Sequence, residues 1–217
     1  MGNRLENMTP AIVVDLDETL VTVNTFHHFI KFTATAAAQK MKLMALLRLT
    51  IAAATRALRI FPHSTLKHTV MNIAAHTLSD AQLLEFASQI TAFTNEKVAN
   101  IISDAHRRGV KVILASAAPA LYAAHIAAIS GCNHCIATEM PQRMKLTECR
   151  GERKKSRVEE YLDTEKLTLE AVITDHSDDI PLIRECINRS GKVFLVSPDI
   201  STISKLKQER ITAYTII

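Results

Sequence analysis

The sequence lacks acidic residues over a long stretch near its start. None of its 22 Asp and Glu residues lies between residues 19 and 79. The same segment contains Lys31, Lys40, Lys42, Arg48, Arg56, Arg59 and Lys67. The formal net charge of +4 therefore combines +7 on this segment with −3 on the remainder, which holds the other 19 bases and all 22 acids. Such an asymmetry predicts that this segment faces an anionic partner, although a solvated basic surface is the ordinary alternative.

Glycine is also scarce, with only five residues in the chain and none between Gly2 and Gly109. Residues 26–90 are rich in Ala, Leu, Met, Lys and Arg, which are good helix formers. Pro62 interrupts this region. Ser79-Asp-Ala-Gln82 has the pattern of a capping box, which predicts a helix over residues 83–90. The segment without acidic residues is therefore expected to be helical.

Other absences exclude several classes of protein. The first ten residues contain no apolar run that could act as a signal peptide, and Glu6 stands where a myristoylation motif has Ser or Thr. We therefore expect a cytoplasmic protein. Cys132 and Cys135 have C-x-x-C spacing, but no second Cys or His pair follows at the spacing of a zinc finger. Free thiols are the expected state in a reducing compartment.

The basic segment has two interpretations. Residues 41–61 are mostly Leu, Ile and Ala, but Arg48, Arg56 and Arg59 interrupt them, and each arginine costs about 2.5–3.5 kcal/mol at the centre of a bilayer. A membrane span is therefore not expected. A basic amphipathic helix could instead lie on an anionic membrane, and the alternative is a packed helix with a solvated basic edge. Nucleic-acid binding is disfavoured because the segment has few aromatic residues for stacking and no known motif. These aromatic residues are Phe26, Phe29, Phe32 and Phe61.

The most informative stretch is Ala11 to Leu20. Four apolar residues lead directly into Asp15 and Asp17. So short an apolar run is typical of a buried strand in a parallel sheet, and ligands bind at the carboxyl ends of such strands. Two carboxylates there could attack as a nucleophile, transfer protons or bind a divalent cation. The alternative is a strand followed by an ordinary acidic turn.

Further strands are predicted after the helical region. They cover residues 110–115, 135–137, 171–174 and 192–196, and residues 211–217 could form an edge strand. Helices are predicted between them, beginning near Asn95, Pro119 and Lys154. This alternation of strands and helices predicts an α/β fold with a parallel sheet covered by helices on both sides.

Four segments together resemble a known family. They are Asp15-Leu-Asp17-Glu-Thr19, Ser116 at the end of a second predicted strand, Lys154, and Asp175 to Asp179 after another strand. This order resembles the haloacid dehalogenase (HAD) superfamily, in its phosphoserine-phosphatase-like branch with relatives of phosphatidylglycerophosphatase C. The resemblance implies a Rossmann-like parallel sheet flanked by helices, with an inserted all-helical cap domain. The core would comprise residues 1–22 and 95–217, and the cap residues 23–94.

The resemblance also implies catalytic roles. Asp15 would be the nucleophile that forms an aspartyl phosphate, and Asp17 the general acid and base. Ser116 and Lys154 would bind the phosphate of the substrate. Lys155 is the alternative to Lys154 in this motif.

A cation follows from the same resemblance. Asp15, Asp17 and Asp175 would bind Mg²⁺, Asp17 through its backbone carbonyl, because a carboxylate beside a phosphate needs a cation between them. Asp179 would hold water ligands or orient the lysine, and Thr19 would support the loop. Asp178 ranks below Asp179 on spacing. The protein would thus be a Mg²⁺-dependent phosphomonoesterase.

Three positions depart from the family pattern. Thr174 stands where glycine is common, and His176 stands where a small residue is usual; we expect His176 to cover the metal site. Asn24 occupies the place of a Glu that grips the amino group in phosphoserine phosphatases, which argues against phosphoserine as the substrate. A small phosphometabolite is the leading substrate class. The alternatives are a phosphatidylglycerophosphate-type lipid at the inner membrane face and a catalytically silent phosphate-binding module.

Overall fold

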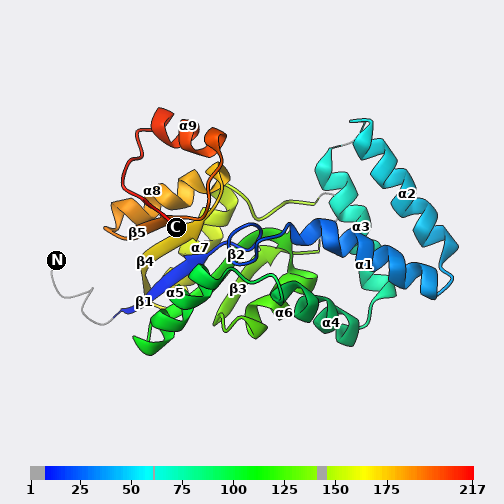
Figure 1. Ribbon diagram of the computed structural model, residues 1–217, viewed down its shortest axis with the longest axis horizontal. Coiled ribbons are helices and arrows are strands. Elements are labelled where there is room, and N and C mark those ends of the chain that lie inside the picture. Colours follow the sequence, from blue (N-terminus) through cyan, green and yellow to red (C-terminus); the bar gives the residue numbers. More distant parts are fainter. Residues whose placement is uncertain (1–7, 61, 141–145) are drawn as a thin grey trace.

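The sheet of this protein is parallel throughout and places strand β1 near its centre. The computed structural model describes residues 8–60, 62–140 and 146–217. Six strands pair in the order β3-β2-β1-β4-β5-β6 (Figure 1). The strands are β1 (Thr9–Val14), β2 (Lys111–Pro119), β3 (His134–Thr138), β4 (Leu167–Thr174), β5 (Lys192–Leu195) and β6 (Thr215–Ile216). The predicted α/β class is confirmed.

Helices connect successive strands and also fill the long interval between β1 and β2. The helices are α1 (Thr25–Gln39), α2 (Leu43–Ala57), α3 (His63–Thr77), α4 (Asp80–Thr91), α5 (Glu96–Arg107), α6 (Ala120–Ile129), α7 (Glu152–Thr164), α8 (Ile180–Asn188), α9 (Ile200–Gln208) and the short 3-10 helix η1 (Ser177–Asp179). The capping box at Ser79 opens α4, and the Asn95 side chain caps α5, both as the sequence predicts.

The alternation of side chains along β1 divides the core into two layers. Ile12 and Val14 pack in one layer with the apolar faces of α5 and α6. Ala11 and Val13 pack in the other layer with α7, α8 and α9. All four side chains are at most 1% exposed. A strand buried on both faces must be apolar at every position, which explains the uninterrupted run before Asp15.

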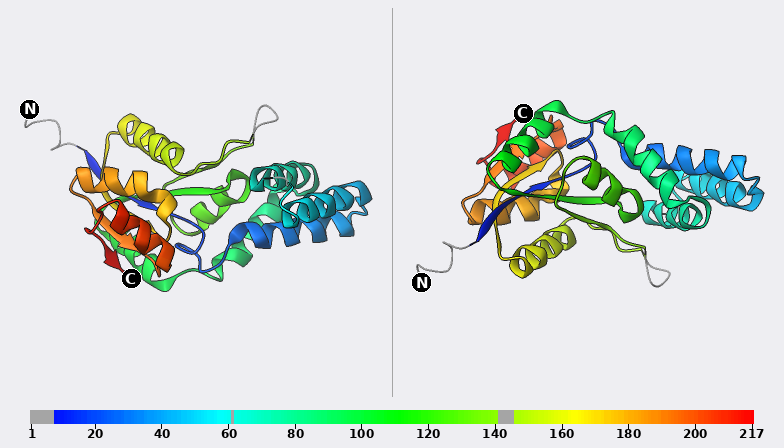
Figure 2. Two further views of the ribbon diagram at one scale, coloured as in Figure 1. Left: turned by 90° about the horizontal axis from the view of Figure 1, so that it is seen from above. Right: turned by 90° about the horizontal axis from the view of Figure 1, so that it is seen from below.

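Helices α1, α2 and α3 extend away from the sheet as an arm (Figures 1 and 2). The N-cap of α1 is Asn24, whose side chain accepts a hydrogen bond from the backbone N–H of His27. Helix α4 leads back from this arm and packs against α6. The division into a core and a cap of residues 23–94 remains our proposal, because α4 lies within that range and shares a core layer with the sheet.

Strand ends differ from the sequence prediction in several places, among them β4, which begins at Leu167 rather than residue 171. Strand β2 continues through Ser116 to Pro119, so the predicted site serine lies inside the strand rather than after it. Strand β6 is limited to Thr215–Ile216, whereas the sequence predicted residues 211–217. The first seven residues, on which the signal-peptide and myristoylation arguments rest, and Phe61 lie outside the described residues.

Candidate active site

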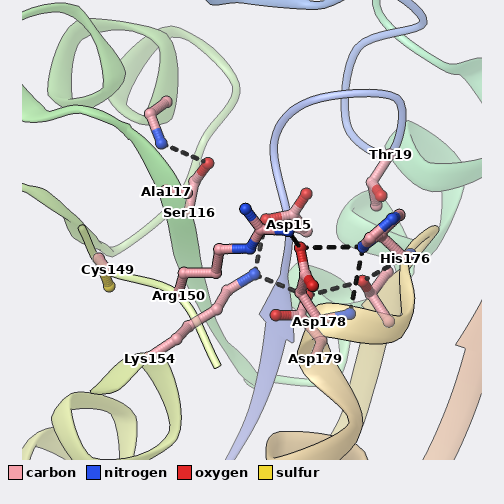
Figure 3. A network of polar contacts seen from close by, with 12 residues as sticks. Asp15, Thr19, Ser116, Ala117, Cys149, Arg150, Lys154, His176, Asp178 and Asp179 are labelled. Atoms are coloured by element: carbon pink, nitrogen blue, oxygen red, sulfur yellow. Dashed lines mark hydrogen bonds and ion pairs between the residues drawn. The ribbon is translucent and has the colours of Figure 1, made fainter. Parts of the chain in front are cut away.

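The predicted site residues meet at the carboxyl ends of β1, β2 and β4. Asp15 directly follows β1 and Asp175 directly follows β4, while Ser116 lies in the last part of β2. Lys154 comes from the first turn of α7. Figure 3 shows the amino group of Lys154 directed between Asp15 and Asp179. These residues line one pocket of about 270 Å³.

Lys154 joins two carboxylates from different elements. Its Nζ lies 2.6 Å from Oδ1 of Asp15 and 2.7 Å from Oδ2 of Asp179. The lysine side chain is 4% exposed, so this is a buried triad rather than a surface ion pair. Lys155 instead pairs with Glu159 one turn along α7. Of the two lysines that the sequence left open, Lys154 is the one that reaches the carboxylates.

Burial is the main cause of the shift in the pKa of Asp15. Removal from water raises the pKa of Asp15 to about 8; Lys154 opposes this shift, while Asp179 and Asp175 add to it. Burial alone would lower the pKa of Lys154, but Asp15 and Asp179 raise it above its usual range. The buried lysine is therefore positively charged. Its charge favours the ionised form of Asp15 that a nucleophile needs.

Asp17 is directed toward the start of α1. Its Oδ1 accepts a hydrogen bond from the backbone N–H of Thr25 at 2.5 Å. Burial raises the pKa of Asp17, and the Thr25 bond partly counters this rise. A raised pKa favours the protonated form of this carboxyl, which is the form that a general acid needs.

Asp175 and its neighbours form the other side of the pocket. The Thr19 hydroxyl donates to Oδ1 of Asp175 at 3.1 Å. Burial raises the pKa of Asp175 to about 6, and the Thr19 bond lowers it. His176 lies at the edge of the pocket with 43% of its side chain exposed, and its Nδ1 accepts from the backbone N–H of Asp178. Asp178 also pairs with Arg150.

Ser116 and Asp179 are held by their surroundings. The Ser116 hydroxyl is buried and accepts a hydrogen bond from the backbone N–H of Ala118 at 3.1 Å. Oδ2 of Asp179 also accepts from the Thr174 hydroxyl at 2.7 Å. Thr174, which departs from the family pattern, therefore has a function here: it fixes the carboxylate that positions Lys154.

Nothing in the sequence indicated that Lys67 and Glu148 would line the pocket. Lys67 of α3 is 5% exposed, and its Nζ lies 2.5 Å from Oε2 of Glu148 and 3.2 Å from the carbonyl oxygen of Ala117. The same Nζ lies 5.6 Å from the ring centroid of Phe26. Lys67 was one of seven basic residues in its segment, and Glu148 lies more than 80 positions away. No local pattern could have paired them.

The metal site expected from the sequence, with Asp15, Asp175 and the backbone carbonyl of Asp17, remains a prediction. Within the described residues no three His, Cys, Asp or Glu side chains are arranged to hold a metal ion. The carboxylate of Asp17 bonds to the backbone N–H of Thr25, and the sequence expected the backbone carbonyl of this residue, not its carboxylate, at the metal. Asp15 and Asp175 line the same pocket, and burial, which removes each carboxyl from water, raises the pKa of both. Mg²⁺ commonly uses one or two carboxylates and keeps several waters, so these two residues fit it.

The family model for haloacid dehalogenase-like hydrolases matches residues 12–184. This chain belongs to that family. The match extends from β1 into α8, so it includes Asp15, Ser116, Lys154 and the segment from Asp175 to Asp179. The HAD assignment expected from the sequence is confirmed, and the family that the chain matches is one of hydrolases.

Solved structures share this HAD fold at low sequence identity. A protein of unknown function from Bordetella pertussis Tohama I is 17% identical, with a TM-score of 0.71 over 97% of this chain and 99% of that one. A phospho-aspartyl intermediate analogue of phosphoserine phosphatase is 17% identical, with a TM-score of 0.55 over 92% of this chain and 91% of that one. Cytosolic 5'-nucleotidase IIIB bound to cytidine is 12% identical, with a TM-score of 0.55 over 95% and 79%.

Two further findings concern this HAD protein. A search of curated protein sequences finds no match. Among the helices formed by described residues, none has the length and apolar character needed to cross a bilayer.

Proposed function

We propose that this HAD protein is a phosphomonoesterase in which Asp15 attacks the phosphorus of the substrate. The observation that carries the proposal is the buried contact of Lys154 with Asp15 and Asp179, 2.6 and 2.7 Å from its Nζ. A lysine held there neutralises the nucleophile and presents a positive charge to an incoming phosphate. Burying these charges costs desolvation free energy, and buried ion pairs seldom stabilise a fold, so a stable core alone would not explain the contact.

The reaction would proceed in two displacements. In the first, an Asp15 oxygen bonds to phosphorus, the bond from phosphorus to the leaving alcohol breaks, and Asp17 donates a proton to that alcohol. In the second, Asp17 takes a proton from water, the water oxygen bonds to phosphorus, and Asp15 is released with inorganic phosphate. Ser116 would bind an oxygen that is not transferred. Asp15, Asp175 and the backbone carbonyl of Asp17 would hold Mg²⁺, which would supply positive charge to offset the negative charge of the phosphate.

The leading substrate class is a small phosphometabolite. The pocket of about 270 Å³ lies below the usual range for drug-sized ligands and has polar side chains on every side. Residues 23–94 would act as the cap that selects the substrate, because Phe26, His27 and Lys67 line the pocket from α1 and α3. A phospholipid phosphate is the second candidate, and the exposed apolar and basic surface of α2 is the observation that favours it.

The test compares Asp15→Asn with Asp163→Asn, a matched change at an exposed position of α7. The wild type and Asp163→Asn should release phosphate from soluble phosphomonoesters with Mg²⁺, and EDTA should stop this release. Asp15→Asn should have no turnover while its circular dichroism remains unchanged. A parallel assay on phosphatidylglycerophosphate in micelles separates the two substrate classes.

Two results would contradict the proposal. Turnover by a verified Asp15→Asn preparation would exclude the covalent mechanism. Phosphate binding by the wild type without turnover of any ester would favour the silent binding module instead.

A further inference from the structure

Helix α2 exposes a row of large apolar side chains. Five of them share one side of the helix, and we call them the α2 stripe: Leu43, Met44, Leu47, Ile51 and Leu58 at its end, 52–71% exposed. Met41 and Ile60, just outside the helix, are 80% and 61% exposed. These seven are the majority of the twelve large apolar side chains exposed among the described residues. Such clustering marks an interaction site, whereas single exposed apolar residues are ordinary.

The opposite side of α2 is already packed. Leu49 is 5% exposed, and Ala45 and Ala52 are partly buried against the same core layer. The α2 stripe therefore does not face the rest of the arm, and α2 lies at the outer edge of the molecule (Figure 1). The sequence left open a basic amphipathic helix on a membrane and a packed helix with a solvated basic edge. In the structure the exposed face of α2 is apolar, and basic residues lie beside it.

The border of the α2 stripe is positively charged. Arg48 and Arg59 are exposed beside the stripe, and among the described residues neither forms an ion pair; Arg56 is also exposed but lies one turn after Ala52, on the other side of the helix. Lys40 and Lys42 donate to the carbonyl oxygens of Thr77 and His76, which leaves their charge unopposed by a carboxylate at those contacts. The sequence has no acidic residue between positions 19 and 79 that could neutralise this border.

We infer that the α2 stripe docks on the surface of an anionic lipid bilayer. An apolar helix face bordered by basic residues matches both layers of such a surface: the side chains enter the acyl boundary while the arginines contact acidic headgroups. A second copy of this chain is disfavoured as the occupant. Two identical stripes related by a two-fold axis would bring like charges together, which opposes association. This docking does not depend on the proposed phosphatase activity.

A tryptophan probe gives the most direct test, because the natural sequence contains none. Leu47→Trp in the full-length protein places one fluorophore on the α2 stripe. Ile200→Trp is the matched control at a 90% exposed position of α9 in the catalytic region. Vesicles of phosphatidylcholine with phosphatidylglycerol should shift the emission of Leu47→Trp to shorter wavelength, and pure phosphatidylcholine vesicles should not. The Ile200→Trp emission should not change with either.

Co-sedimentation separates the apolar and electrostatic contributions. Leu47→Asp with Ile51→Asp should weaken binding to acidic vesicles at least tenfold, whereas Ile200→Asp should not. Arg48→Gln, Arg56→Gln and Arg59→Gln together should weaken it at low salt more than the same change at Lys192, Lys205 and Lys207, which are exposed elsewhere. Binding of the wild type should fall as salt rises, because the Debye length shortens from about 10 Å at 0.1 M to about 3 Å at 1 M.

Two outcomes would overturn the inference. The first is equal sedimentation of the wild type and the Leu47→Asp, Ile51→Asp variant with acidic vesicles. The second is a dimer in lipid-free solution, measured by size exclusion with light scattering, that this variant converts to monomer. Thermal unfolding followed by circular dichroism shows whether each variant is folded, so neither result depends on enzyme activity.

Discussion

The backbone N–H of Thr25 donates a hydrogen bond to Oδ1 of Asp17 over 2.5 Å. Thr25 is the first residue of α1, where the helical arm begins, and Asp17 lies in the loop that follows β1. The helix start therefore holds the side chain proposed as general acid. The first N–H groups of a helix have no partner within the helix, so this bond satisfies one of them while it fixes the carboxylate.

Replacing Thr25 by proline should impair catalysis while α1 remains folded. Proline is tolerated at the first helical position, and Asn24 before it is extended, as proline requires. The variant loses the N–H and so frees the Asp17 carboxylate. We expect kcat to fall at least about tenfold, since a positioned general acid contributes about 10²–10⁴ in rate.

Thr25→Val is the matched control for this change. It keeps the N–H but loses the hydroxyl that lies 2.9 Å from the Tyr122 hydroxyl. Its kcat should stay near that of the wild type, with a loss of about 1 kcal/mol in the free energy of unfolding. Equal kcat values for Thr25→Pro and Thr25→Val would show that the N–H bond does not position Asp17.

Lys154→Met and Lys155→Met should differ strongly although the residues are adjacent. Lys154 is buried between Asp15 and Asp179, whereas Lys155 pairs with Glu159 within α7. We expect Lys154→Met to lower kcat by about 10²–10³, the range seen when one preorganised charge donor is removed. Lys155→Met should keep its activity and change stability by less than about 0.5 kcal/mol. Steady-state kinetics, at a temperature where both are folded, makes the comparison.

Thr19→Val should make the Mg²⁺ requirement more sensitive to acid. The Thr19 hydroxyl lowers the pKa of Asp175, which burial raises to about 6, so its loss raises that pKa further. Metal binding needs the ionised carboxylate, and protons compete below the pKa. The apparent Mg²⁺ constant should rise up to about tenfold near pH 6, for a shift of about one pKa unit, and less near pH 8.

Thr22→Val controls for the loss of a threonine hydroxyl on the same loop, because that hydroxyl donates to the carbonyl oxygen of Phe93 instead. Its Mg²⁺ dependence should match the wild type at both pH values. A change in Thr19→Val that is the same at acid and alkaline pH would mean that Thr19 acts on the loop rather than on the charge of Asp175.

Lys67→Met should destabilise the protein, and Lys31→Met should not. Lys67 is buried and donates to Glu148 and to Ala117, so its removal leaves two acceptors without this donor. We expect a loss of about 1–3 kcal/mol in the free energy of unfolding, measured by urea denaturation. Lys31 is an exposed lysine of the same acid-free segment and should change stability by less than about 0.5 kcal/mol. Equal midpoints would mean that the pair makes no net contribution.

The sequence determined the parallel sheet and the carboxylates that follow β1 and β4. The run before Asp15 is apolar at every position, a pattern that only a strand buried on both faces requires, and the structure buries all of it. Strands of one parallel sheet place their carboxyl ends together, so Asp15, Ser116 and Asp175 could be expected in one site although they are far apart in sequence. Local patterns were sufficient here because burial and strand direction are local properties.

Tertiary structure alone decided which charges meet and which surfaces remain open. The pairing of Lys67 with Glu148 and the choice of Lys154 over Lys155 depend on how α3 and α7 rotate against the sheet, and neighbouring residues of a helix point in different directions. Likewise, Leu47 and Leu49 are equally apolar, yet Leu49 is buried and Leu47 is half exposed. Both sides of α2 contain apolar residues, and only the packing of that helix on its neighbours shows which side is buried and which is exposed.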